Sequence, residues 1–113
     1  MTTHYKIDGA MDTQTISTLE ETFATLMLLG NDIILDLEDV DFMDSSGVGI
    51  IVYLYKKQIE DDFNLTLMNV NGQPLRLLKY LRIDKVMRIE AEEEFSSMPV
   101  IAAQEYNKNM GMS

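Results

Sequence analysis

The segment Ile33–Leu37 constrains the fold of this chain most strongly, because four of its five residues are aliphatic. A strand with one exposed face alternates apolar and polar residues, whereas a strand covered on both faces is almost continuously apolar. We therefore predict a central strand here, covered on both faces and parallel to its neighbour.

Helical and extended patterns alternate around this strand. A short strand precedes Gly9–Asp12, and an apolar series then predicts a helix over about 13–29, capped by Asp12 and ended by Gly30. A loop over 38–47 leads into a second helix, whose predicted buried face consists of Val48, Ile51, Val52, Tyr55 and Ile59. The remaining expected elements are a strand over Asn64–Val70, a short helix around Leu75–Leu81, a strand over Val86–Ile89 and a helix from about Ser97 to Asn107. This order predicts an α/β fold, with a single layer of mixed, largely parallel sheet of about four strands and about four helices.

Length and composition favour one domain spanning 1–113, with 108–113 as a frayed tail. The chain has no cysteine, so disulfides and thiolate metal sites are excluded. The first residues lack the pattern of a signal peptide, and no apolar run is long enough to cross a bilayer. A cytoplasmic protein without direct membrane insertion is therefore expected.

The net charge of -10 is concentrated in the first part of the chain, where residues 1–62 hold 13 acidic residues and three lysines. An acidic body repels nucleic acid and anionic lipid, so we do not expect either as a partner. A basic or mixed protein surface is the expected counterpart.

The segment Asp39–Gly49 carries the most specific chemistry, since it joins a buried strand to a helix start. Free amides and the helix dipole favour an anion there, so Ser45 or Ser46 could cap the helix or carry a phosphate. Gly47 and Gly49 disfavour a helix, which indicates a tight turn or a close approach to the backbone. A simple Ser/Asp cap is an equally open interpretation of these residues.

The stretch 36–49, which contains Phe-Met-Asp-Ser-Ser-Gly, resembles the signature of STAS domains, and specifically of anti-sigma factor antagonists. The later strand Leu-Thr-Leu-Met-Asn-Val and the helix Pro-Leu-Arg-Leu-Leu follow in the family's order. The resemblance implies a STAS-like fold and a binding module that needs no cofactor. It further implies that Ser45 is phosphorylated by an anti-sigma factor that is a serine kinase of the histidine-kinase-like ATPase type, and that a PP2C-type serine phosphatase reverses this. Gly9 and Asp12 match a turn that helps to build the partner surface in that family.

A switch follows as a hypothesis: the unmodified chain sequesters the anti-sigma factor, and phosphate on Ser45 releases it. A phosphoserine adds roughly -1.5 to -2 charges beside Asp39, Asp41 and Asp44. The expected partner-binding residues are Asp12, Met43, Asp44, Ser46, Gly47, Val48, Ile50, Tyr53 and Leu54. Three of these, Ile50, Tyr53 and Leu54, are expected to form an exposed apolar patch, although Ile50 and Leu54 could instead pack beneath neighbouring loops.

Other functional classes fit the sequence less well. His4 is the only histidine, and Gly-x-Ser-x-Gly and phosphate-binding Gly-Lys-Ser/Thr motifs are absent, so we do not expect an enzyme. The acids of 38–44 resemble a calcium loop only weakly, because Ile50 occupies the twelfth position. The alternative within the family is a regulatory module of a transporter or lipid-transport complex, or a partner switch whose output is not a sigma factor.

Overall fold

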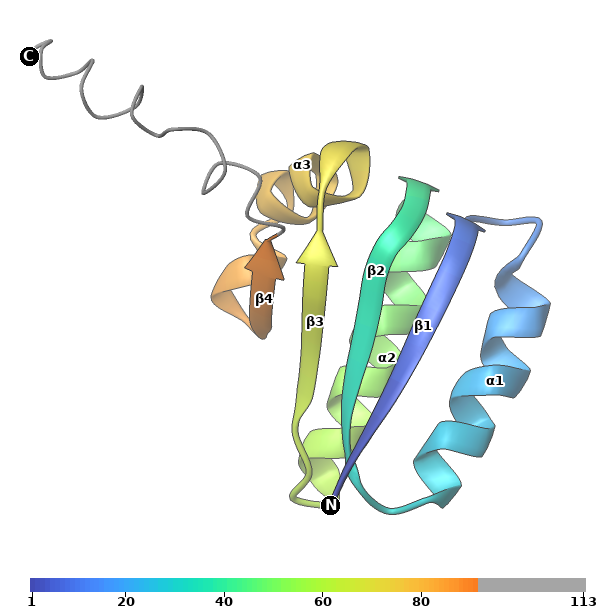
Figure 1. Cartoon of the computed structure of the whole chain (residues 1–113), viewed down its shortest axis with the longest axis vertical. Helices are drawn as coiled ribbons and strands as arrows, with labels where there is room; N and C mark the ends of the chain where they lie inside the picture. The colour runs from blue at the N-terminus through green and yellow to red at the C-terminus, as the bar shows by residue number, and fades with distance from the viewer. Residues whose placement is uncertain (92–113) are drawn as a thin grey trace, which may run out of the picture.

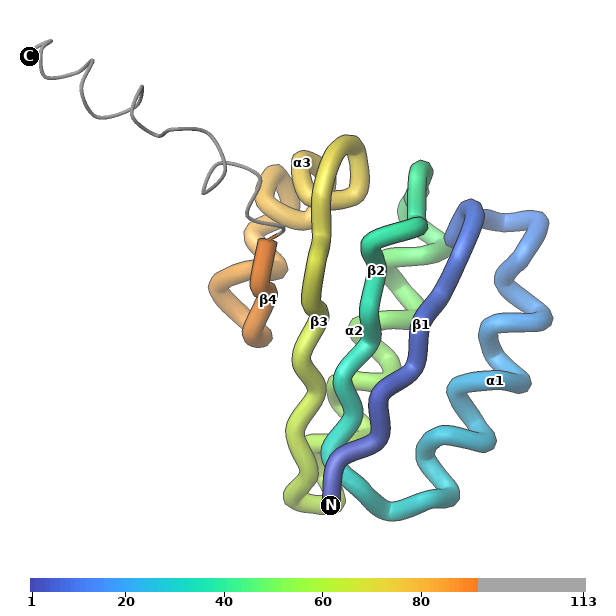
Figure 2. Tube along the Cα trace, in the orientation of Figure 1, coloured from blue at the N-terminus to red at the C-terminus, as the bar shows by residue number. Residues whose placement is uncertain are grey.

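The computed structural model describes residues 1–91, so the helix predicted over 97–107 and the predicted tail lie outside the described residues. Four strands form one sheet, namely β1 (Thr2–Met11), β2 (Asp32–Met43), β3 (Leu65–Val70) and β4 (Arg88–Ala91). Their spatial order is β1-β2-β3-β4, and every neighbouring pair is parallel. Figure 2 shows the chain crossing the sheet in this order. The predicted α/β fold with a largely parallel sheet is confirmed.

A helical element connects each strand to the next. These elements are α1 (Ile16–Leu28), α2 (Ser45–Glu60), and α3 (Gly72–Tyr80) followed by a 3₁₀ turn over Ile83–Lys85. In Figure 1, α2 lies behind the sheet and α1 lies beside it near β1. Within residues 1–91, no helix is both long and apolar enough to span a bilayer.

The helices α1 and α2 cover one face of the sheet, which corrects the prediction of a central strand buried on both faces. Along β2, Ile33, Leu35 and Leu37 are buried, whereas Ile34 and Asp36 are only partly buried. Parallel crossovers are right-handed, so strands added successively in one direction leave their helices on the same face. The apolar run therefore reflects one fully buried face and one half-covered face.

The first two strands are longer than predicted. Pairing of β1 with β2 continues from Lys6 and Asp36 through two register shifts to Met11 and Met43. Most of the predicted loop over 38–47 is therefore strand. Its backbone groups pair with β1, which is distant in the sequence. Pairing of β2 with β3 ends at Asp36 and Met68, so beyond that point β2 has a strand only on its β1 side among the described residues.

Helix α1 begins three residues later than predicted, because a hydrogen-bonded turn precedes it. Oδ1 of Asp12 accepts hydrogen bonds from the backbone N–H groups of Gln14 and Thr15, at 3.0 and 3.2 Å. Asp12 thus satisfies free amides as predicted, but in the turn before the helix. The left-handed Gly30, with a φ of 64°, follows the end of α1 as expected.

The core lies between the sheet and these helices. Its fully buried side chains include Phe23 of α1, Leu35 of β2, Leu54 of α2 and Leu67 of β3. Ile59, predicted on the buried face of the second helix, is instead 47% exposed near the carboxyl end of α2. The last strand also begins two residues later than predicted, because the 3₁₀ turn precedes it.

Candidate functional site

The junction of β2 and α2 is organised by the carboxylate of Asp44, the N-cap residue of α2. Its Oδ1 accepts hydrogen bonds from the backbone N–H groups of Ser46 at 2.8 Å and Gly47 at 3.2 Å. This is the arrangement by which an acidic residue satisfies the free amides of a helix start. The cap of α2 is therefore supplied by Asp44, and the serine hydroxyls are not needed for it.

The two serines differ in their surroundings. Ser45 is exposed, and its hydroxyl forms no hydrogen bond within the described part of the chain. Ser46 is half-buried, and its Oγ lies 3.2 Å from Oγ1 of Thr13. Ser45 is thus the hydroxyl that solvent or an enzyme reaches directly.

The second carboxylate oxygen of Asp44 reaches across to the turn that follows β1. Its Oδ2 accepts hydrogen bonds from the backbone N–H and the hydroxyl of Thr13, both at 3.3 Å. The backbone N–H of Asp44 also donates to the carbonyl of Met11, at 3.2 Å. Asp44 therefore joins the turn containing Asp12 to the start of α2, and it brings these two parts of the predicted partner surface together.

These contacts shift the pKa of Asp44. Partial removal of water raises the pKa of the carboxyl, but hydrogen bonds from Gly47, Thr13 and Ser46 oppose this and leave the pKa below its ordinary value. Hydrogen bonds to the ionised form favour that form. Asp44 is therefore anionic at neutral pH, and it places one full negative charge beside Ser45.

The two glycines in the first turns of α2, Gly47 and Gly49, differ in the space around their Cα atoms. A Cβ on Gly47 would overlap the carbonyl oxygen of Met11 and would lie 2.9 Å from the Cβ of Met11. At Gly49, a Cβ would meet no atom within 4 Å. The predicted close backbone approach is confirmed at Gly47, whereas Gly49 faces open space.

The predicted exposed apolar patch on α2 is wrong for two of its three members. Ile50 is 6% exposed and Leu54 is fully buried, whereas Tyr53 is 52% exposed. Ile50 and Leu54 share a helical spacing of three or four residues with the other buried residues Gly47, Ile51 and Gln58, so they lie on the face of α2 that packs into the core. Met43, Gly47 and Val48 are buried as well, so these residues support the site from beneath and do not offer side chains to a partner.

An open groove between α1 and α2 begins near the candidate site. Ser46, Gly49 and Tyr53 line it from α2, and apolar side chains of α1 such as Phe23 and Met27 line it from the other side. Nζ of Lys57 lies 5.7 Å from the centre of the Tyr53 ring, which is within the range of a cation–π contact. Tyr53 is therefore the aromatic group that this flank presents to solvent.

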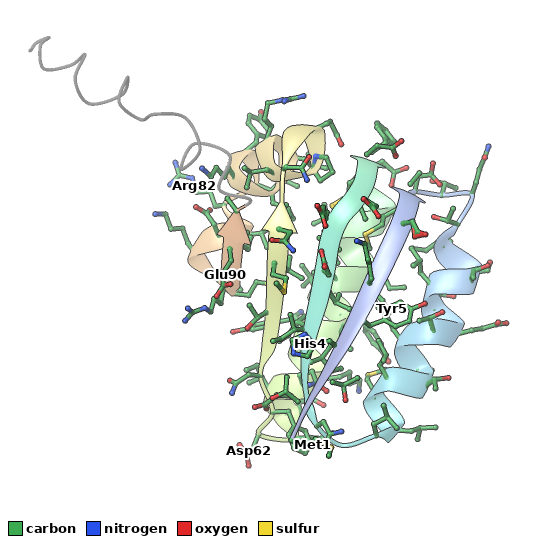
Figure 3. The ribbon with its side chains drawn as sticks, viewed as in Figure 1. Met1, His4, Tyr5, Asp62, Arg82 and Glu90 are labelled. Atoms are coloured by element: carbon green, nitrogen blue, oxygen red, sulfur yellow. The ribbon has the colours of Figure 1, made fainter. Side chains whose placement is uncertain are left out.

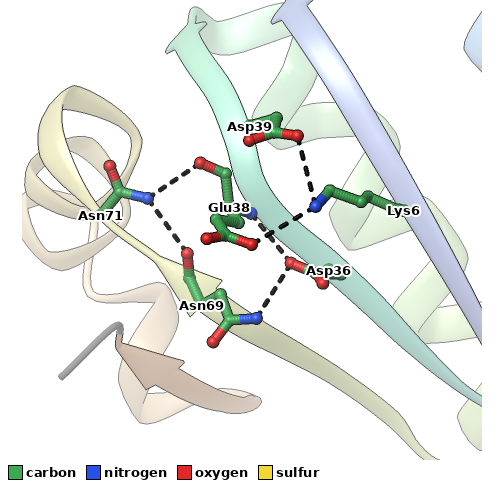
Figure 4. Close-up of polar contacts among 6 residues, drawn as sticks. All are labelled: Lys6, Asp36, Glu38, Asp39, Asn69 and Asn71. Carbon is green, nitrogen blue, oxygen red and sulfur yellow. Dashed lines mark hydrogen bonds and ion pairs between the residues drawn. The ribbon is translucent and has the colours of Figure 1, made fainter.

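The acids of β2 that precede the site are partly neutralised. Nζ of Lys6 lies 3.3 Å from both Glu38 and Asp39, as Figure 4 shows. Oδ1 of Asp36 accepts hydrogen bonds from the backbone N–H of Glu38 and from the side-chain amide of Asn69. Partial burial raises the pKa of Asp36, but these hydrogen bonds outweigh it and the pKa is lowered. Across residues 1–91, no three acidic or histidine side chains are arranged to hold a metal ion.

The only histidine lies away from this junction. His4 pairs in register with Ile34, toward the amino ends of the strands, whereas the site follows Met11 and Met43 at their carboxyl ends. Seven residues of strand, about 23 Å at the usual rise, separate His4 from the end of β1. Figure 3 shows His4 and Tyr5 on β1 well below its upper end.

Two residues that organise the site were missed by sequence analysis. The sequence pattern places Thr13 only in the first turn of a helix, and it indicates no role for Gln73 of α3. Oε1 of Gln73 accepts from the backbone N–H of Met43, and its Nε2 donates to the carbonyl of Met43, both at 2.8 Å. Both contacts join residues 30 or more positions apart, and no local pattern signals them.

A parallel four-stranded sheet with α1 and α2 on one face, and a helix capped by Asp44 that begins at an exposed serine, define a small α/β domain. The family model described as "STAS domain" matches residues 2–96, and the chain belongs to this family. Its recognition from the Phe-Met-Asp-Ser-Ser-Gly segment is confirmed.

Relatives agree with this assignment. The anti-sigma-B factor antagonist of Staphylococcus aureus is 30% identical over 90 residues, which cover 79% of this chain and 83% of the relative. A protein of the same name from Staphylococcus epidermidis is 29% identical over the same coverage.

Two solved structures share the fold. One, from Thermotoga maritima, is described as a candidate anti-sigma factor antagonist and has a TM-score of 0.66 at 24% identity, covering 75% of this chain and 72% of that one. The other is the anti-sigma factor antagonist SpoIIAA in its unphosphorylated form, with a TM-score of 0.55 at 22% identity, covering 72% of this chain and 84% of that one.

Proposed function

We propose that this protein is an anti-sigma factor antagonist that works by partner switching. Its unphosphorylated form binds and sequesters an anti-sigma factor that is also a serine kinase, and phosphorylation of Ser45 releases that partner. The names of the staphylococcal relatives support the antagonist role. The observation that carries the switch is the exposed hydroxyl of Ser45 beside Asp44, which already caps α2.

The position of Ser45 suits a modification that leaves the fold intact. The positive end of the α2 dipole favours a phosphate at this place. Because Ser45 is exposed, its phosphate extends into solvent and displaces no core side chain. The phosphate changes what a partner meets at this surface.

The effect on a partner is electrostatic. Phosphoserine adds roughly -1.5 to -2 charges at pH 7, next to the anionic Asp44. A partner surface that presents acidic or apolar groups here then meets repulsion and a desolvation cost. A loss of about 3 kcal/mol weakens binding more than 100-fold, which is enough to free the partner.

The docking surface that we propose is smaller than the one expected from the sequence. It consists of Asp12, Asp44, Ser45 and Ser46 at the junction, with Tyr53 further along α2. The other expected binding residues are buried and support this surface by packing in the core; they are Met43, Gly47, Val48, Ile50 and Leu54. The proposed partners are a kinase of the histidine-kinase-like ATPase type and a PP2C-type phosphatase, as the family resemblance implies. Binding and modification, not catalysis by this chain, are its proposed activity.

The experiment is phosphorylation of the purified chain by cell extract and ATP, with the modified residue mapped by mass spectrometry. Ser45→Ala and Ser46→Ala form a matched pair of controls, because they remove neighbouring hydroxyls of different exposure. We expect phosphate on Ser45 in the wild-type chain, and we expect the same modification in the Ser46→Ala variant. Phosphate on Ser46 alone would move the site by one residue. An unmodified chain that co-purifies with a membrane ATPase would favour a regulatory module of a transport complex.

A further inference from the structure

The side chain of Gln73 occupies the place of a neighbouring strand at the end of β2. Its amide accepts from the N–H and donates to the C=O of the same residue, Met43, at 2.8 Å each. In a parallel sheet, the N–H and the C=O of one residue both form hydrogen bonds to the same neighbouring strand, as Met43 does here with Gln73. Since β3 stops pairing with β2 at Asp36, Gln73 supplies the partner that β3 no longer provides.

The contact lies one residue before the candidate site. Met43 is the last residue of β2, and Asp44 follows it directly. On its other side, Met43 is in register with Met11 of β1, whose carbonyl accepts from the N–H of Asp44. The backbone that carries Asp44 is therefore held from two sides, by β1 and by Gln73.

Gln73 is itself anchored through α3. It lies in the first turn of that helix, next to the buried Pro74, and Leu78 one turn later is fully buried. Figure 1 shows α3 at the same end of the sheet as the end of β2. A displacement of α3 therefore acts on the backbone of Met43 through two short hydrogen bonds.

We propose that Gln73 is a positioning residue that holds Asp44 in its capping geometry and thereby keeps Ser45 presented for its kinase. The presentation of Ser45 rests on the proposed function, whereas the positioning of Asp44 does not. The amide of Gln73 is required because its oxygen accepts from the N–H of Met43 while its nitrogen donates to the C=O of Met43. Glutamate offers no donor at neutral pH, and methionine offers neither group while keeping a similar length.

The test compares Gln73→Met with Gln58→Met. Gln58 is a suitable control because its Nε2 also donates to backbone carbonyls, those of Asn31 and Asn64, at 2.9 and 3.1 Å. It is 3% exposed and lies near the opposite end of α2. Both substitutions thus remove partly buried hydrogen bonds between a side-chain amide and the backbone, but only Gln73 lies beside Asp44.

Amide hydrogen exchange is measured at Met43, Ser46 and Gly47, together with the rate of Ser45 phosphorylation by extract and ATP. In Gln73→Met we expect exchange to rise about tenfold or more at all three amides, since local opening governs protection. We also expect Ser45 phosphorylation to slow by about tenfold, which corresponds to a change of about 1.4 kcal/mol. Gln58→Met is expected to lower the melting temperature while leaving these amides and the phosphorylation rate unchanged.

Two results would overturn the proposal. Unchanged protection of Ser46 and Gly47 in Gln73→Met would show that Asp44 does not depend on Gln73. An equal loss of phosphorylation in Gln58→Met would show that Gln73 contributes only to overall stability. If Gln73→Met does not fold, Gln73→Glu replaces it, because the N–H of Met43 then keeps an acceptor while its C=O loses the donor.

The failure of the proposed function gives a different pattern. If the wild-type chain accepts no phosphate on Ser45, the switch fails. The exchange at Ser46 and Gly47 still decides whether Gln73 positions Asp44.

Discussion

Thr13 and Asp44 are joined by two hydrogen bonds, since the backbone N–H and the hydroxyl of Thr13 both donate to Oδ2 of Asp44 at 3.3 Å. The other oxygen of the same carboxylate caps α2. One side chain thus connects the turn after β1 with the helix that begins at Ser45. Changes in either segment are expected to affect the other.

Replacing Thr13 with valine tests this connection. The variant keeps the backbone N–H bond but loses the hydroxyl contacts with Asp44 and Ser46. Because the hydroxyl is exposed, we expect a loss of at most about 1 kcal/mol in the free energy of unfolding, measured by urea titration. Thr18→Val is the control, since Thr18 lies exposed on α1 away from Asp44. An equal loss in both variants would contradict the prediction.

The two glycines at the start of α2 are expected to respond in opposite directions. Gly47→Ala forces a Cβ against the end of β1, and overpacking of this kind costs about 1–3 kcal/mol or more. Gly49→Ala meets open space and improves helix propensity, so it is expected to stabilise the chain by about 0.5–1 kcal/mol. Thermal unfolding of both variants measures this, and a destabilised Gly49→Ala chain would disagree with the geometry.

The same Gly49 variant also probes the groove between α1 and α2. If a partner enters that groove beside Tyr53, Gly49→Ala should weaken partner binding while raising stability. Calorimetry with the kinase identified by the phosphorylation experiment separates the two effects.

Tyr53 and Leu54 are neighbours on α2 but differ in burial, so their substitutions are expected to have different effects. Leu54 is fully buried, and truncation of such a residue to alanine costs about 2–5 kcal/mol of stability. Tyr53 is 52% exposed, so Tyr53→Ala is expected to change stability little and to weaken partner binding. Urea unfolding and binding assays on both variants test this. Equal destabilisation by the two substitutions would contradict the assignment.

Acid should destabilise the chain partly through Asp44 and Asp36. Both carboxyls have a pKa below the ordinary value of 3.8 in the folded chain. Their stabilising contribution is complete above the unfolded pKa, and it is lost as the pH falls through the lower folded pKa. The melting temperature should therefore drop between about pH 5 and pH 2, where such carboxylates become protonated.

The substitution Asp44→Asn measures how much Asp44 contributes to the loss of stability at acidic pH. Asparagine also caps helices, so the variant should remain folded while its stability falls less steeply with acid. Asp41→Asn is the control, because the Asp41 side chain is exposed and its carboxylate forms no hydrogen bond or ion pair within residues 1–91. Identical pH profiles for the two variants would show that Asp44 does not contribute.

Features that depend on neighbours a few residues apart could be predicted from the sequence alone. The alternation of strand and helix patterns predicted the parallel sheet, and Asp12 and Gly30 marked the region of α1. The Asp-Ser-Ser-Gly segment indicated a nearby helix start and identified the family, although α2 begins at Ser45, before the predicted end of the loop at residue 47. These signals are local because caps, turns and periodic apolar faces depend on short stretches of chain.

Tertiary structure decided what depends on distant parts of the chain. The strand order and right-handed crossovers placed the helices on one face, and β1 extended β2 through the predicted loop. The orientation of α2 on the core buried Ile50 and Leu54 and left Tyr53 exposed. The contacts of Asp44 with Thr13 and of Met43 with Gln73 join residues 31 and 30 positions apart. Only the folded sheet brings these groups within hydrogen-bonding distance, because their separation along the chain leaves no periodic or local signal.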